Sequence, residues 1–179
     1  MPFIHIVPFQ LLLSIDFEPL KEIILKTFNI QPTISNQKID ISDTYDIKRN
    51  QYHSSKILIK LNEIKSEGAV KILGITELDL FIPILTFVFG EAQLNGTASV
   101  ISLFRLKNQF YGLPEDNKLL SERMGKEAIH ELGHNFGLFH CDNYRCVMKS
   151  STYVEDVDIK SIDLCHLCKE LLLKSLKNL

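Results

Sequence analysis

Three histidines and one glutamate occur within residues 130–140 at spacings that suit a metal site. The segment reads H-E-x-x-H-x-x-G-x-x-H, and His130 and His134 share one face of a helix because they are four residues apart. Gly137 can take a positive φ angle, end that helix and let His140 approach the same ion. Three neutral imidazoles leave a tetrahedral zinc ion with one open position, as in catalytic rather than structural sites.

Glu131 directly follows the first histidine, where its carboxylate can reach a water on the metal rather than the metal itself. Zinc lowers the pKa of such a water towards about 7 and polarises a carbonyl group. Glu131 would then take a proton from the attacking water and deliver it to the leaving amine. Five specified residues at these spacings arise by chance in on the order of one in 10⁵ chains of this composition and length. The pattern therefore predicts zinc-dependent hydrolysis of peptide bonds.

All four cysteines follow this motif as two close pairs, Cys141 with Cys146 and Cys165 with Cys168. The first 140 residues contain no cysteine, which is unlike a disulfide framework spread over a secreted domain. Two close pairs separated by a loop suit a tetrahedral Cys₄ zinc site. Such a site has no open position and stabilises the fold, with apparent binding energies of about 10–16 kcal/mol in zinc-finger peptides.

Three alternatives remain for these thiols: two disulfides, a redox pair at Cys165 and Cys168, or buried free thiols. A redox pair normally lies in a thioredoxin-like βαβ context, which this sequence lacks. His166 could replace one thiolate, although we expect it to face solvent. Because Cys141 directly follows His140, a structural ion here would clamp the loop that delivers the third histidine.

Length and composition favour one globular domain over residues 1–179. Apolar residues make up 45% and charged residues 23% of the 179 residues, which is ordinary for a globular protein. The net charge of −2 gives no broad electrostatic footprint for nucleic acid or an anionic membrane. We therefore expect neither nucleic acid nor membrane as a partner.

The apolar stretch over residues 2–13 has some features of a signal peptide. It has no preceding basic residue and no small-residue cleavage site, and it contains Pro2 and Pro8. We interpret it as a buried strand that leads towards a helix. No apolar run approaches the roughly 20 residues of a membrane span. A cytoplasmic location is therefore expected.

Hydrophobic periodicity and turn signals predict an α+β domain with a mixed, twisted sheet, two backing helices and an active-site helix under the sheet. The Asn95-Gly96 pair predicts a turn, and residues 114–117 supply the signals that start the active-site helix. A strand edge above the metal would suit an extended peptide. We expect Phe87, Phe89 and Phe110 in the core. Helices are predicted over residues 16–28, 45–66, about 117–136 and 159–176, and strands over 3–7, 30–34, 70–76, 85–89 and 98–106.

The chain resembles the archaemetzincins, a branch of the metzincin zinc peptidases, over most of its length. The histidine motif is followed by cysteines and a methionine at the family's spacing: Cys141, Cys146-Val147-Met148 and Cys165-x-x-Cys168. Earlier stretches also resemble the family: Arg49-Asn50-Gln51-Tyr52, Leu73-Gly74-Ile75-Thr76 with Asp79-Leu80, and Phe87-Val88-Phe89-Gly90-Glu91-Ala92.

This resemblance implies a zincin-like fold and a single metallopeptidase domain with two zinc ions, one catalytic and one structural. The upper part would span about residues 1–136, and the lower part about 137–179. Met148 would be the Met-turn residue, with its thioether beneath the three imidazoles; the alternative is an ordinary core methionine.

The chain departs from the family pattern in two places. Sixteen residues separate Met148 from the last cysteine pair, where the family usually has seventeen, and a one-residue deletion in a surface loop costs little. Some metzincins have a tyrosine two residues after the methionine, where this chain has Ser150. The third ligand position also varies in the family, and His140 favours a competent catalytic site.

Two other functions compete with a peptidase. A catalytically silent zinc protein would bind peptides or act as a scaffold without cutting, and it would have no physical need for Glu131. A redox or zinc-ribbon protein would bind metal through its thiolates alone. The expected partner of the favoured function is a peptide or protein substrate.

Overall fold

A computed structural model describes residues 1–64 and 66–177 of the chain. Its central sheet contains β1 (Phe3–Pro8), β2 (Gln31–Ile34), β5 (Ala69–Thr76), β7 (Gly90–Ala92) and β8 (Ala98–Ser102). The strand order is β2-β1-β5-β8-β7, in which β7 runs antiparallel to β8 and the other neighbours are parallel. A smaller sheet contains β3 (Tyr45–Asp46), β4 (Gln51–His53) and β6 (Leu80–Phe81). The predicted α+β class with a mixed sheet is confirmed.

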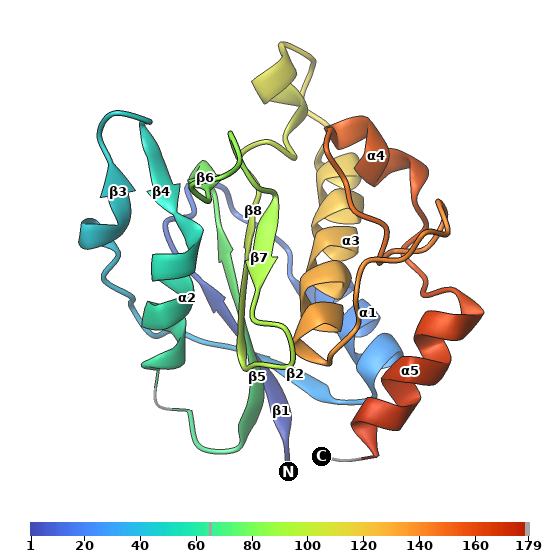
Figure 1. Cartoon of the computed structure of the whole chain (residues 1–179). Coiled ribbons are helices and arrows are strands. Elements are labelled where there is room, and N and C mark those ends of the chain that lie inside the picture. The colour runs from blue at the N-terminus through green and yellow to red at the C-terminus, as the bar shows by residue number, and fades with distance from the viewer. Residues whose placement is uncertain (65, 178–179) are drawn as a thin grey trace.

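Helices cover both faces of the central sheet (Figure 1). Side chains alternate along a strand, so Ile4 and Ile6 of β1 pack towards α1 and α3 while Val7 packs towards α2. One continuous apolar cluster joins α1, α3 and the C-terminal segment, and a second lies under α2. The helices are α1 (Glu18–Phe28), α2 (Ser54–Asn62), α3 (Asn117–Asn135), α4 (Val154–Ile159) and α5 (His166–Leu176), with short 3₁₀ segments η1 (Ser42–Thr44) and η2 (Asn108–Tyr111).

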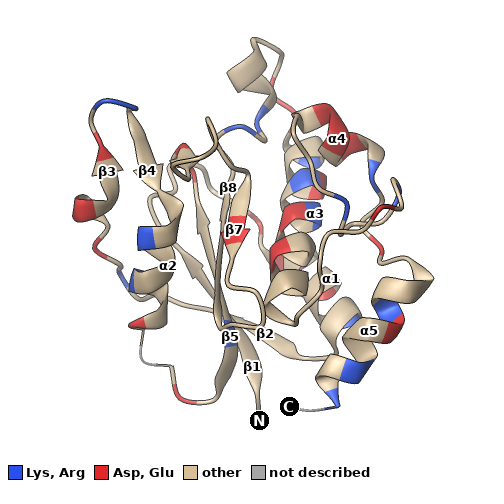
Figure 2. Cartoon of the chain, in the orientation of Figure 1, with Lys and Arg blue, Asp and Glu red and all other residues tan. Residues whose placement is uncertain are grey.

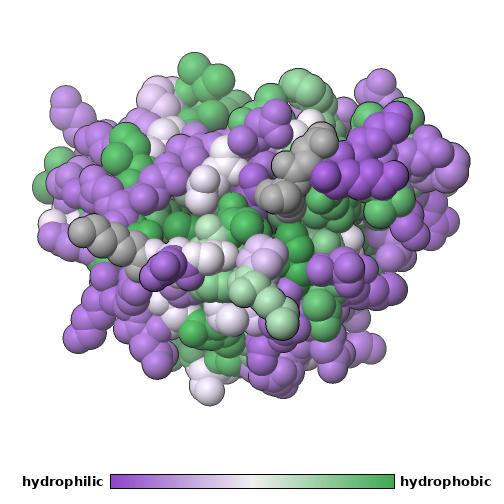
Figure 3. All heavy atoms as spheres, turned by 90° about the horizontal axis from the view of Figure 1, so that it is seen from below, coloured by the Kyte–Doolittle hydropathy of each residue, from purple (hydrophilic) through white to green (hydrophobic). Residues whose placement is uncertain are grey.

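Charged and apolar residues are distributed unevenly over the surface. Figure 2 shows charged residues of both signs along α3 and α5 and acidic colour on β7, while β1 and β8 carry no charged residue. Seen from below, hydrophilic residues surround the rim of the molecule and apolar residues lie nearer its middle (Figure 3).

The predicted helix over residues 45–66 is wrong in its first half. The helix begins only at Ser54 and ends at Asn62, and strands β3 and β4 lie within residues 45–53. Residue 65 of the predicted helix lies outside the described residues. The Asp46 carboxylate accepts hydrogen bonds from the backbone N–H groups of Lys48 and Arg49, and Asn50 adopts a left-handed φ of 55°. Short polar side chains of this kind offer the backbone a turn that competes with a helix.

The predicted C-terminal helix over residues 159–176 is also interrupted. Residues 160–165 lie outside α4 and α5 because their backbone bonds to the loop that follows His140. Ser161 N–H donates to the Arg145 carbonyl oxygen at 2.8 Å, and Val147 N–H donates to that of Asp163 at 3.1 Å. These tertiary bonds separate the helices and bring the second cysteine pair towards the first.

Lys71 of β5 links the central sheet to the end of α3. Its ammonium group lies 2.8 Å from the carbonyl oxygens of both Gly96 and Asn135, and 4.8 Å from the Phe136 ring centroid. A cation at a helix C-terminus complements the partial negative charge there. Burial lowers the pKa of Lys71. Lys71 thereby ties the end of α3 to the turn between β7 and β8.

Replacing Lys71 by methionine should lower the free energy of unfolding by about 1–3 kcal/mol, because the buried Asn135 carbonyl and the partly buried Gly96 carbonyl lose this donor. Urea denaturation measures the change, with the exposed Lys118→Met as the control, for which a change below about 0.5 kcal/mol is expected. Equal stability of Lys71→Met and wild type would show that this contact does not secure the helix end.

Candidate active site and metal centre

Helix α3 carries the first part of the histidine motif. It begins after Asp116, whose carboxylate accepts a hydrogen bond from Leu119 N–H at 2.9 Å and so caps the helix as the sequence predicts. The helix ends at Asn135, and Gly137 has the predicted positive φ, at 87°. The chain then turns back and brings His140 towards the helix.

The three histidines converge. One ring nitrogen from each of His130, His134 and His140 lies within 4.8 Å of the others. The Nε2 atoms of His130 and His134 are 3.2 Å apart. Zinc–nitrogen bonds of about 2.0–2.1 Å in a tetrahedron place two ligand nitrogens about 3.3 Å apart. The geometry of this pair therefore fits one zinc ion.

Backbone carbonyl groups orient two of these rings. His130 Nδ1 lies 2.8 Å from the Val147 carbonyl oxygen, and His134 Nδ1 lies 2.7 Å from that of Leu138. A carbonyl oxygen only accepts, so each Nδ1 carries the proton and each Nε2 presents a lone pair. Two lone pairs facing each other repel unless a cation lies between them. The donor set therefore fits a divalent metal.

Burial favours the neutral form that a metal ligand requires. Desolvation lowers the pKa of all three rings and brings that of His130 well below its usual value, and the positive charge of Lys160 adds to this effect. Neutral imidazole is the form that binds metal, so the lowered pKa values favour the protonation state that a metal site requires.

The carboxylate of Glu131 is buried beside this cluster and rests on the edge strand β7. Its burial raises its pKa well above the usual value, and the negative charge of Glu127 raises it further. A Cβ atom on Gly90 would lie 2.6 Å from Glu131 Oε1, so the carboxylate occupies space that only a glycine leaves free. The sequence pattern did not identify Gly90 as a site residue.

Met148 is fully buried and packs against the helix between the first two histidines. A Cβ atom on Gly133 would overlap the Met148 sulfur atom. Glycine at this position of the motif therefore lets the methionine approach α3 closely.

The four cysteines form a second cluster. One sulfur atom from each of Cys141, Cys146, Cys165 and Cys168 lies within 4.8 Å of the others. The sulfur atoms of Cys141 and Cys165 are 3.7 Å apart, too far for a disulfide of about 2.05 Å but close to the roughly 3.8 Å between thiolates on tetrahedral zinc. Backbone hydrogen bonding lowers the pKa of Cys165, whereas burial raises that of Cys146 and Cys168.

The His166 side chain lies outside this cluster. It is 90% exposed, as expected, and its Nε2 lies 3.4 Å from a carboxylate oxygen of Glu170. The geometry therefore suits a set of four thiolates.

A cleft of about 580 Å³ opens over the histidine cluster. Residues 85–92 form one side, and this segment was predicted as a strand over 85–89, which is wrong. Arg49 Nη2 donates instead to the carbonyl oxygens of Leu85 and Thr86 at 2.6 and 3.1 Å, and Gln51 Nε2 donates to that of Thr86 at 2.9 Å. The side chains of Arg49 and Gln51 thus supply hydrogen bonds that the backbone of a neighbouring strand would otherwise provide.

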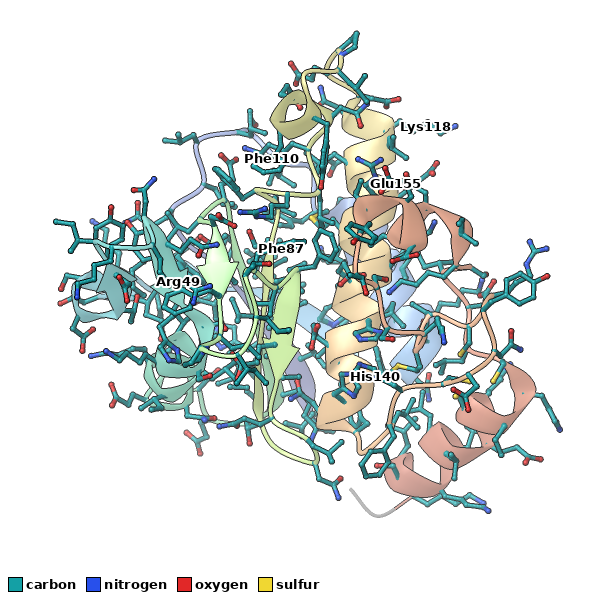
Figure 4. All side chains as sticks on the ribbon, turned by 45° about the horizontal axis from the view of Figure 1, so that its top comes forward. Arg49, Phe87, Phe110, Lys118, His140 and Glu155 are labelled. Carbon is teal, nitrogen blue, oxygen red and sulfur yellow. The ribbon has the colours of Figure 1, made fainter. Side chains whose placement is uncertain are left out.

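Arg105 supports the same side of the cleft. Its guanidinium forms two hydrogen bonds to the Asp79 carboxylate, at 2.7 and 2.8 Å, and lies 4.3 Å from the Phe87 ring centroid and 4.7 Å from that of Phe110. Figure 4 shows Phe87 in the part of the molecule between Arg49 and Phe110. The prediction that all three phenylalanines lie in the core is wrong in part, because Phe89 is buried but Phe110 is 41% exposed.

A Gly90→Ala substitution should displace the Glu131 carboxylate with little change in melting temperature, because the overlapping atoms belong to the end of a flexible side chain. A crystal structure of the variant measures the displacement. Any reaction that uses this carboxylate should slow, while metal content stays unchanged. An undisplaced Glu131 would show that the edge strand does not position it.

Comparison with known proteins places this geometry in a family. The model for peptidase family M54 matches residues 19–174. Archaemetzincin from Methanocaldococcus jannaschii is 46% identical over 132 residues, covering 73% of this chain and 72% of the relative. Archaemetzincin from Pyrococcus furiosus is 48% identical over 128 residues, covering 71% and 67%.

Solved structures share the fold over nearly the whole chain. The crystal structure of archaemetzincin from Methanopyrus kandleri superposes with a TM-score of 0.88 at 33% identity, covering 98% of this chain and 96% of that one. A zinc-dependent peptidase from Methanocorpusculum labreanum gives a TM-score of 0.83 at 30% identity, covering 94% and 99%. The expected zincin-like fold is therefore confirmed. This chain belongs to the archaemetzincins of peptidase family M54, and it is a zinc metallopeptidase.

Proposed function

We propose that the enzyme hydrolyses peptide bonds at a zinc ion held by His130, His134 and His140, with Glu131 as the general base. The observation that carries this proposal is the convergence of three ring nitrogens beside a buried carboxylate in one cleft. Zinc bound there supplies a Lewis acid that polarises the substrate carbonyl and acidifies water. Glu131 takes the proton of the attacking water and delivers it to the leaving amine.

The environment of Glu131 suits a base that must also release its proton. A carboxylate of ordinary pKa is a weak base towards a zinc-bound water of pKa about 7, so a raised pKa matches the two groups better for proton transfer. Burial and the charge of Glu127 raise its pKa, while Lys160 opposes them. A divalent cation at the histidines would also favour the charged form. These opposing effects allow the carboxylate to exchange a proton during one turnover.

A second, structural zinc ion is the proposed occupant of the cysteine cluster, held by Cys141, Cys146, Cys165 and Cys168. Cys141 follows His140 directly, and its N–H donates to the Met148 carbonyl oxygen at 3.0 Å. Val147, whose carbonyl group orients His130, directly follows Cys146 in the sequence. An ion held by the thiolates would thus stabilise the backbone that positions two catalytic ligands.

We further propose a single domain over residues 1–179, with an upper part of about 1–136 and a lower part of about 137–179. Gly137 and Met148 support the ligands in the lower part, the latter as the Met-turn residue. The substrate is a peptide or protein, which in extended form could pair with the edge strand β7. None of the helices in residues 1–64 and 66–177 is long and apolar enough to cross a membrane. The cytoplasmic location stays a prediction.

The alternative of a silent, peptide-binding zinc protein would keep both clusters without cutting. The position of Glu131 favours the enzyme, since a buried carboxylate with a raised pKa destabilises a protein near neutral pH. A scaffold would gain nothing from retaining it.

Glu131→Ala should retain zinc but lower peptide turnover by about 10²–10⁴-fold, the usual contribution of a general base. A peptide library incubated with zinc-loaded protein, with and without chelator, reports cleavage by mass spectrometry. His134→Ala is the matched control, which should lose the metal of this site as well as activity. Cleavage by Glu131→Ala at the wild-type rate would assign the base elsewhere.

Cys165→Ser should remove about one zinc ion per chain, lower the melting temperature and reduce peptide turnover by about 10–100-fold, as for groups that support metal ligands. Atomic absorption measures the zinc content. His166→Ala, at an exposed neighbour, should change neither zinc content nor turnover. Unchanged zinc in Cys165→Ser would show that the thiol cluster binds no ion.

A further inference from the structure

We propose that the cleft contains a subsite for an uncharged polar side chain of the substrate, formed by the buried Glu127–Lys160 ion pair and the hydroxyl residue Ser151. This inference rests on the proposed function, because it names a side-chain class that the same cleft accepts.

The two sides of the cleft differ in chemistry. The side formed by residues 82–94 is mainly apolar, with Leu85, Phe87 and Phe89 among its members. The opposite side contains Glu127 from α3 and the polar residues 150–152 from the loop after Met148. A substrate side chain that enters between α3 and this loop therefore meets polar groups.

Glu127 and Lys160 form an ion pair at this polar side. Lys160 Nζ lies 2.8 Å from Glu127 Oε1, and the exposed fractions of the two side chains are only 1% and 3%. The ammonium group also lies 3.3 Å from the Lys149 carbonyl oxygen. Because each charge is matched by the other, the pair itself carries no net charge.

Hydrogen-bonding capacity remains unused at this pair. Glu127 Oε1 has its ion-pair contact with Lys160, but within residues 1–64 and 66–177 no hydrogen bond to this buried oxygen is present besides it. In the same part of the chain, the buried hydroxyl oxygen of Ser151 has no hydrogen-bond partner. A carboxylate can accept several hydrogen bonds, and a hydroxyl group can both donate and accept. Buried groups of this kind are normally paired, which points to a partner that enters with the substrate.

These features select the chemistry of the occupant. An aliphatic side chain would leave the polar atoms unpaired, which disfavours its binding. A lysine or an aspartate side chain would add an unmatched charge to a neutral pair. Asparagine, glutamine, serine or threonine can hydrogen-bond to the Glu127 carboxylate and to the Ser151 hydroxyl group without adding charge.

Peptide binding to the Glu131→Ala variant tests the proposed subsite separately from hydrolysis. Zinc-loaded protein is titrated with fluorescent peptides in which asparagine or the isosteric leucine is placed at each position in turn, and anisotropy reports the affinity. We expect asparagine to bind at least tenfold more tightly than leucine at one position, since a site with buried polar groups rejects an analogue that cannot pair with them. No difference at any position, or a preference for leucine, lysine or aspartate, would overturn the subsite.

Two substitutions of the pair separate recognition from a structural role. Glu127→Leu combined with Lys160→Met replaces the pair by apolar groups of similar size, a change that buried ion pairs often tolerate. It should abolish or reverse the preference for asparagine. Glu127→Gln leaves the positive charge of Lys160 without its acidic partner. This variant should therefore bind the aspartate peptide more tightly than the asparagine peptide. Retention of the wild-type preference by both variants would mean that the pair only holds the C-terminal segment on α3.

The matched control is a second pair on the same helix. Lys118 and Glu122 lie 4.0 Å apart and are exposed, and Lys118 is at the opposite end of the helix from His140 (Figure 4). Lys118→Met combined with Glu122→Leu should leave the peptide preference unchanged. Digestion of the same peptides by protein with Glu131 intact tests the proposed function. Selective binding without cleavage would therefore contradict the peptidase mechanism while supporting the subsite.

Discussion

Two unprotonated imidazole nitrogens held 3.2 Å apart are the constraint on which this structure depends. Without a cation their lone pairs repel, so the fold must hold the rings against that repulsion. It does so with carbonyl groups of Val147 and Leu138, which fix the Nδ1 protons and aim both Nε2 atoms at one point. Because one carbonyl belongs to the loop after the motif and the other to the turn at the end of α3, two segments must keep their positions together.

The rest of the fold supplies that rigidity from both sides. Lys71 and the turn between β7 and β8 hold the C-terminal end of α3, where Asn95 N–H donates to the His134 carbonyl oxygen at 2.9 Å. On the other side, the segment after Gly137 brings the four cysteines together, and Met148 of the same segment packs against Gly133. The edge strand β7 then borders Glu131 through Gly90. Helix α3 is thus contacted at its C-terminal end, at Gly133 and at Glu131.

Much of the candidate site could be predicted from the sequence because its determinants are local. The spacing of His130, His134 and Gly137 determines which side of α3 they share and where the helix ends. The helix predicted from residue 45 failed because Asp46 and Asn50 stabilise a turn that periodicity does not detect. The strand predicted over 85–89 failed because the carbonyl groups of Leu85 and Thr86 bond to Arg49, more than thirty residues away. Gly90 and Lys160 carry no local signal, since their roles come from contacts made only in the folded chain.

The most direct test of the central claim is anomalous diffraction at the zinc absorption edge from crystals of the zinc-loaded protein. We expect a zinc ion at the histidine cluster, about 2.0–2.1 Å from one nitrogen of each of His130, His134 and His140, with a fourth position free for water or substrate. Zinc at the four thiolates alone, with the three rings turned away from a common centre, would contradict it.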